Sequence, residues 1–327
     1  MATSETIANE IIKLIEQGKS PDAVKMELSI LPDKWFGYSS KAYNIYLAKA
    51  RKERKGIENK KHVSATSNDQ ILEIIDLNEK LGDYALLLPI LSTNGELKAI
   101  SNLVDQLPTT EDEIIKIIGR ATLHPRLRAL QKKGRIEKFD YFKTFSKLID
   151  AAILSYYRTN FISCYLTLLP VIEGVIIRWM GYTETSPKPE FEDVRKFFKN
   201  AAQRQPCPYN VLFHNIYVKA CDKILNNHFY KPTTTGNSWA NFNRHVASHL
   251  LNDNQFGTKE NCIRLFILLD AMTEIFVYES RISDPRFNIR NDEIENDITL
   301  YGTVIVDNLK TTPEHTMFGT TFLDIEV

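Results

Sequence analysis

Three side chains that can carry positive charge or transfer a proton lie within residues 243–249. In a helix, His245 and His249 share a face because they are four residues apart, and Arg244 reaches the same region through its long, forked side chain. Asn243 is a residue type that caps helices, which would place Arg244 at a helix N-terminus, where free backbone N–H groups favour an anion. Imidazole groups change charge near cellular pH and guanidinium groups clamp phosphates. The segment therefore predicts phosphate and proton-transfer chemistry.

The same two histidines allow a different interpretation, because His245 and His249 have the spacing of two metal ligands on one helical turn. Zinc proteases place a glutamate directly after the first histidine of such a pair, whereas this chain has Val246 there. A third ligand would have to come from elsewhere in the chain. We therefore expect a site without metal or cofactor, with a metal hydrolase as the alternative.

Composition and charge narrow the class of protein. The chain has 327 residues, enough for a large core, and 41 Lys and Arg balance 41 Asp and Glu, which argues against nucleic-acid binding by bulk charge alone. Its four cysteines form no Cys-x-x-Cys pair, which is typical of reduced thiols rather than a zinc ribbon. No signal-peptide pattern opens the sequence, and the most apolar run, 162–180, contains Glu173 and Arg178. We therefore expect a cytoplasmic protein without a membrane partner.

A helical unit over residues 137–281 is expected to position residues 243–249. Its second helix, over residues 160–180, is apolar over most of its circumference, which makes Glu173 an anomaly. Two interpretations stay open: Glu173 faces solvent at the helix edge, or it is a buried acceptor that orients Arg244 across the core. A polar loop precedes the segment, and Thr258 begins a long final helix after it.

The Arg244-x4-His249 motif stands at the start of a late helix in this unit, and the wider string is Asn243-Arg244-His245-x3-His249. Phe256-Gly257-Thr258-x-Glu260-Asn261 follows it. Together these features resemble the HEPN superfamily of ribonucleases, in particular its members from prokaryotic toxin and phage-defence systems. The resemblance covers about residues 137–281, and the run 169–174 fits the family's second helix. One departure is Leu250, because related sequences usually place glycine after the last histidine.

The resemblance implies a metal-independent endoribonuclease acting on RNA as a toxin or antiphage effector. Arg244 would stabilise the charge of the phosphate and His249 would move a proton, with Asn243 and His245 in supporting roles. The attacking group would be the 2′-hydroxyl of RNA, and the product would carry a 2′,3′-cyclic phosphate. In this family the cleft forms between two protomers, so a homodimer or higher homo-oligomer is expected. Such an enzyme needs restraint, which suggests a regulatory partner or phage trigger.

Residues 1–61 are expected to form an N-terminal unit of three short helices, with a turn around Pro32 and Gly37. The unit resembles helix-turn-helix modules, whose last helix carries the recognition side chains. A small dimerisation or docking domain is the alternative. If this unit carries the main activity, the chain is a noncatalytic nucleic-acid-binding regulator or sensor.

A basic tract follows the third of these helices and is interpreted as a linker. It contains Lys49, Arg51, Lys52 and Arg54. These side chains either bind nucleic-acid phosphates or belong to a solvated helix end.

Two further regions complete the predicted organisation. Residues 62–136 are expected to be helical, and the cluster of His124, Arg126 and Arg128 is interpreted as an exposed turn. In the tail, residues 282–327, a β-branched run at 298–306 predicts a strand that would pair with residues 320–327 or with another protomer. The expected fold class is mainly α: a C-terminal HEPN-like helical bundle, an N-terminal helix-turn-helix-like domain and a short β tail.

Overall fold

The computed structural model describes residues 3–57, 66–201, 211–233, 238–251, 255–280 and 284–308. These residues form helices joined by turns, with no strand among them, so the expected mainly α class is confirmed. The helices are α1 (Ser4–Glu16), α2 (Pro21–Glu27), α3 (Pro32–Ile57), α4 (Thr66–Gly82), α5 (Asn94–Leu103), α6 (Glu111–Leu123), α7 (Pro125–Gln131), α8 (Asp140–Lys143), α9 (Ser146–Tyr157), α10 (Phe161–Trp179), α11 (Phe191–Arg195), α12 (Val211–Ile224), α13 (Arg244–Ser248), α14 (Lys259–Glu279) and α15 (Asn291–Asn308).

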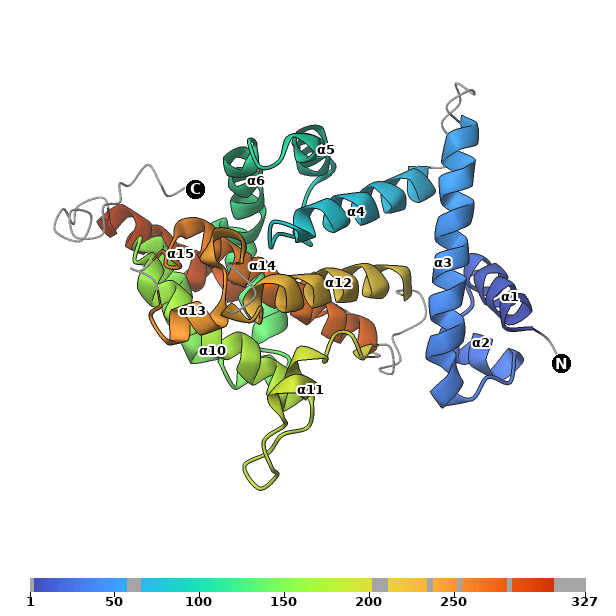
Figure 1. Cartoon of the computed structure of the whole chain (residues 1–327). Helices are drawn as coiled ribbons and strands as arrows, with labels where there is room; N and C mark the ends of the chain where they lie inside the picture. The colour runs from blue at the N-terminus through green and yellow to red at the C-terminus, as the bar shows by residue number, and fades with distance from the viewer. Residues whose placement is uncertain are drawn as a thin grey trace.

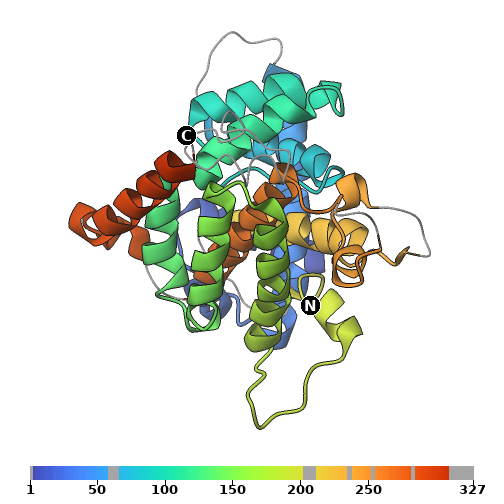
Figure 2. The ribbon, with the colours of Figure 1, turned by 90° about the vertical axis from the view of Figure 1, so that its left-hand side faces the viewer.

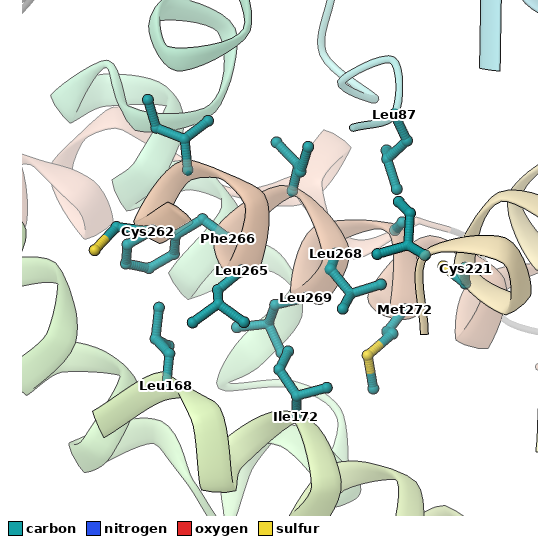
Figure 3. Packing of buried hydrophobic residues seen from close by; sticks show 14 of the residues in the cluster. Leu87, Leu168, Ile172, Cys221, Cys262, Leu265, Phe266, Leu268, Leu269 and Met272 are labelled. Atoms are coloured by element: carbon teal, nitrogen blue, oxygen red, sulfur yellow. The ribbon is translucent and has the colours of Figure 1, made fainter. Parts of the chain in front are cut away.

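Helix α14 runs through the centre of the bundle and is buried along most of its length. Its N-cap is Thr258, as the sequence predicted, because the Thr258 side chain accepts a hydrogen bond from the Asn261 N–H. In Figure 3, α14 lies between α10, which contributes Leu168 and Ile172, and α12, which contributes Cys221. All three helices belong to one apolar core that extends along the chain from Leu77 to Ile305.

Three charged residues of α14 are buried or partly buried and are paired with side chains from the region before residue 137. Arg264 contacts Glu111 at the start of α6. Asp270 lies 2.6 Å from Arg128, and Glu274 lies 2.7 Å from Arg135. Because a buried charge is costly without a partner, these pairs fasten residues 111–135 to the central helix.

One of these pairs corrects the expectation of an exposed basic turn for Arg128, whereas His124 and Arg126 are exposed as expected. Arg128 is completely buried, and its guanidinium binds both carboxylate oxygens of Asp270. The turn was predicted from local sequence, whereas the partner of Arg128 lies 142 residues further along the chain. The middle region shares its core with the C-terminal helices, and the domain division at residues 136 and 281 stays a prediction.

Helices α1 to α3 form a second, smaller apolar cluster that includes Trp35, which is fully buried. Figure 1 shows this unit at one end of the molecule, where α3 packs against α4 and α12. α3 begins at Pro32 and continues through Gly37, so the turn expected there is wrong. Proline is well suited to a first helical position, because its missing N–H would have no partner there. The helix-turn-helix assignment stays a prediction.

The basic tract at residues 49–54 is the C-terminal part of α3 rather than a linker. The backbone there is helical, whereas the side chains of Lys49, Arg51, Lys52 and Arg54 lie outside the description. Their contact with nucleic acid therefore stays a prediction.

The predicted strand at residues 298–306 is wrong, because α15 covers it. Tyr301, Val304 and Ile305 fall on one face of this helix together with Ile294 and Asp297, and that face packs against α7 and α9. The apolar residues of 298–306 are buried along one face of a helix, and this burial outweighs the preference of β-branched residues for strands. Residues 320–327, the other expected strand, lie outside the described residues.

Helix α10 is the one described helix that is long and apolar enough to cross a membrane by length and composition. A core helix satisfies the same test. α10 packs against α9 and α14, and Figure 2 shows α9 and α10 side by side. Pro170 lies inside α10, and the helix continues on both sides of it.

Gly257 allows the segment before α14 to touch α10. A Cβ atom at residue 257 would lie 2.5 Å from Cγ1 of Ile162 and 3.0 Å from its backbone Cα. Because a backbone atom cannot move aside cheaply, Gly257→Ala should lower the free energy of unfolding by about 1–3 kcal/mol in urea titrations. Gly37→Ala is the control: Gly37 lies inside α3 with nothing near its Cβ position, so this change should stabilise by about 0.5–1 kcal/mol. Equal effects of the two variants would contradict the close approach.

Candidate functional site

Asn243 begins α13 and connects it to the chain before it. Its Oδ1 accepts hydrogen bonds from the N–H groups of His245 at 2.7 Å and Val246 at 3.2 Å, which confirms the predicted N-cap. Its Nδ2 donates to the carbonyls of His228 at 3.2 Å and Lys231 at 2.7 Å. The side chain is 1% exposed and satisfies four backbone groups.

The same geometry corrects the expectation of an anion site made by this helix start. α13 has five residues, and the Asn243 side chain already occupies two of the N–H groups at its beginning. The attraction for an anion must therefore come from the side chain of Arg244, which holds the first position of the helix.

Arg244 forms an ion pair with Glu173 of α10. Arg244 Nε lies 2.6 Å from Glu173 Oε2, and a longer contact of 3.5 Å joins Nη2 to Oε1. The side chain of Glu173 is 12% exposed, so the interpretation of Glu173 as a buried acceptor of Arg244 is confirmed. A guanidinium group has five N–H donors in a planar fork, and this pairing leaves most of them for a ligand. Lys188 was not among the predicted site residues. Its Nζ lies 3.8 Å from Glu173 Oε1 and adds a second cation beside this carboxylate.

His245 and His249 lie next to each other on the surface, with ring centroids 4.4 Å apart and an angle of 61° between the rings. Both side chains are exposed, which excludes a structural role in the core. They share a face as predicted, although His249 caps the end of α13 and is not inside the helix. Within the described ranges, no group of three or more His, Cys, Asp or Glu side chains is placed to hold a metal ion, so those residues supply no third ligand.

Arg244, His245 and His249 line one cavity of about 510 Å³. The remaining wall comes from α11 and from the segment before residue 234. It consists of Phe191, Arg195, Phe229, Tyr230, Lys231, Pro232 and Thr233. Cavities of this size hold small ligands and single nucleotides. Three cationic side chains line the cavity in addition to the two histidines' rings, so it suits an anionic ligand.

Sequence reasoning missed the aromatic wall of this cavity. The guanidinium carbon of Arg244 lies 5.4 Å from the ring centroid of Phe191, and the ring centroids of Phe191 and Tyr230 are 5.3 Å apart. Burial raises the pKa of the Tyr230 hydroxyl, so the group stays a neutral phenol. The aromatic pair at residues 229–230, directly before the polar loop, was the available signal.

No protein-family model, curated protein or solved structure matches the chain. Functional inference therefore depends on the site itself.

Leu250 completes the end of α13 in a conformation that favours glycine. Its φ angle is +50°, and the Leu250 and Leu251 N–H groups donate to the carbonyls of Ala247 and Val246. This pair of bonds is the Schellman arrangement, in which the residue after the C-cap is left-handed. Related HEPN sequences usually have glycine at the position of Leu250. The structure shows that this position has a backbone conformation that glycine adopts more easily than leucine.

We expect Leu250→Gly to stabilise the protein by about 0.5–1 kcal/mol. Glycine removes the steric cost of a leucine in the left-handed conformation, and this gain exceeds the extra conformational entropy that glycine loses on folding. Little apolar burial is lost, because the Leu250 side chain is 64% exposed. Thermal unfolding measures the change. Leu251→Gly serves as the control, since Leu251 is similarly exposed without a positive φ, and it should be neutral or destabilising. A loss of stability in Leu250→Gly alone would refute the conformational argument.

Asn243→Asp tests the connection made by the Asn243 amide. The carboxylate keeps the two acceptor contacts to α13 but cannot donate to the carbonyls of residues 228 and 231, and it places a charge in a buried position. The free energy of unfolding should fall by about 2–5 kcal/mol in urea titrations. In Asn241→Asp, the matched control, one bond to Gln255 near the surface is affected, and the change should stay within about 0.5 kcal/mol.

Proposed function

We propose that this chain is a metal-independent endoribonuclease that cleaves RNA by attack of the 2′-hydroxyl on the adjacent phosphate. The observation that carries the proposal is the meeting of Arg244 and His249 at one cavity, with Arg244 held by the buried carboxylate of Glu173. The HEPN-like order of these residues along the chain supports the same reaction.

Each side chain has a defined role in the proposed reaction. His249 accepts the proton of the 2′-hydroxyl, whose oxygen forms a bond to phosphorus while the bond from phosphorus to the 5′-oxygen breaks. The departing 5′-oxygen takes up a proton, from the adjacent His245 or from water. The products are a 2′,3′-cyclic phosphate and a 5′-hydroxyl, and no metal is needed because RNA supplies the nucleophile.

Arg244 binds the phosphate and stabilises the negative charge that develops on it during the attack. Glu173 holds the guanidinium through Nε, which fixes the direction of the remaining N–H groups toward the cavity that Arg244 lines. Glu173 is therefore a positioning residue, because its contact with the reaction passes through Arg244. Lys188 offsets part of its negative charge.

The biological setting follows from the HEPN resemblance and is part of the proposal. The enzyme acts in a prokaryotic toxin or antiphage system, as a homodimer whose two sites face each other. A regulatory partner or phage trigger would control the activity.

Cleavage of RNA by the purified full chain in EDTA tests the proposal. Arg244→Ala should slow cleavage about 10²–10³-fold, because one stabilising contact to the developing charge is lost. His249→Ala should slow it about 10²–10⁴-fold, and Glu173→Gln by a smaller factor, since the amide still accepts a hydrogen bond. Product ends are mapped for a 2′,3′-cyclic phosphate.

Arg290→Ala and Ser248→Ala are the controls for this experiment. Arg290 is an exposed arginine on the last described loop, and Ser248 is exposed beside His249 without lining the cavity. Both variants should cleave at the wild-type rate. Cleavage at the wild-type rate by both Arg244→Ala and His249→Ala would contradict the proposed endoribonuclease mechanism. Loss of activity in EDTA with recovery in zinc would favour the metal hydrolase instead, and RNA binding without cleavage would favour the noncatalytic regulator.

A further inference from the structure

The wall of the cavity beside Arg244 includes two aromatic residues, Tyr230 and Phe191, that the proposed reaction does not use. Tyr230 is 4% exposed, and its hydroxyl forms no hydrogen bond with the residues that the structure describes. The hydroxyl oxygen itself is buried and does not open onto the cavity, so Tyr230 contributes to the wall through its other atoms. Tyr230 lines the cavity, and the charges of Glu173 and Arg244 both act on its hydroxyl.

Phe191 gives the same cavity an aromatic surface. Its side chain projects from α11 and is 45% exposed, which is unusual for a residue that already contacts Tyr230 and Arg244. A half-exposed aromatic ring in a cationic cavity is what single-stranded nucleic acid uses for base stacking. The cavity volume of about 510 Å³ leaves room for a base as well as a phosphate.

We propose that this cavity binds the base of one nucleotide next to the scissile phosphate, with the base stacked against Phe191. The inference rests on the proposed function for the identity of the neighbouring phosphate. It adds an aromatic subsite for the base beside the phosphate that Arg244 binds. Phe191 supplies affinity for any base, because every base has a flat face that can stack on an aromatic ring.

Nucleotide binding tests this site without any requirement for cleavage. The full chain is titrated in EDTA with inorganic phosphate and with the four nucleoside 3′-monophosphates. Wild type should bind the best nucleotide at least about tenfold tighter than phosphate, and Phe191→Ala should remove that advantage. Phe191→Tyr, which keeps the aromatic face, should retain it. Phosphate and nucleotides bound equally by wild type, or full nucleotide affinity in Phe191→Ala, would overturn the proposal.

The two proposals can fail separately. Phe191-dependent binding of nucleotides without Arg244-dependent cleavage would contradict the nuclease and support the base site. Arg244-dependent cleavage by a protein that binds nucleotides no better than phosphate would support the nuclease and contradict the base site.

Discussion

The burial of α14 is the constraint on which the rest of the bundle depends. A helix surrounded by other helices cannot leave a charge unpaired, yet α14 carries Arg264 and Glu274 in buried positions and Asp270 in a partly buried one. Each finds its partner in a helix or turn from residues 111–135, and the apolar residues of α14 meet α10 and α12. The charges therefore decide which surfaces pack together, while apolar burial provides most of the stabilisation.

The same requirement shapes the candidate site at the edge of that core. Glu173 is on α10, which is almost entirely apolar, so its carboxylate needs a cation within reach. Arg244 meets that need and remains 30% exposed, because it stands at the start of a short helix on the rim of the bundle. A pair that is buried on one side and open on the other keeps a cation at a fixed place without removing it from solvent.

Local signals in the sequence predicted caps and helices well. Asn243 and Thr258 are N-caps as expected, and of the two interpretations that the sequence left open for Glu173, the buried acceptor of Arg244 is the one observed. What failed depended on distant contacts. Arg128 looked exposed because its partner is 142 residues away, and residues 298–306 looked like a strand until packing on α7 and α9 made them helical. The aromatic side of the cavity was missed for the same reason: residues 229–230 are a visible aromatic pair, but Phe191, which packs against Tyr230, comes from a separate segment.

The four hydrogen bonds of Asn243 have a consequence for the shape of the cavity. Two of them hold α13, where Arg244 begins, and the other two hold the carbonyls on either side of residues 229–230. A single amide thus fixes the spacing between the guanidinium and the aromatic wall before any ligand arrives. A ligand whose charged group and aromatic ring match that spacing would bind both parts of the cavity without an entropic cost for ordering the protein. A ligand with a different spacing would contact either the guanidinium or the aromatic wall, and not both together.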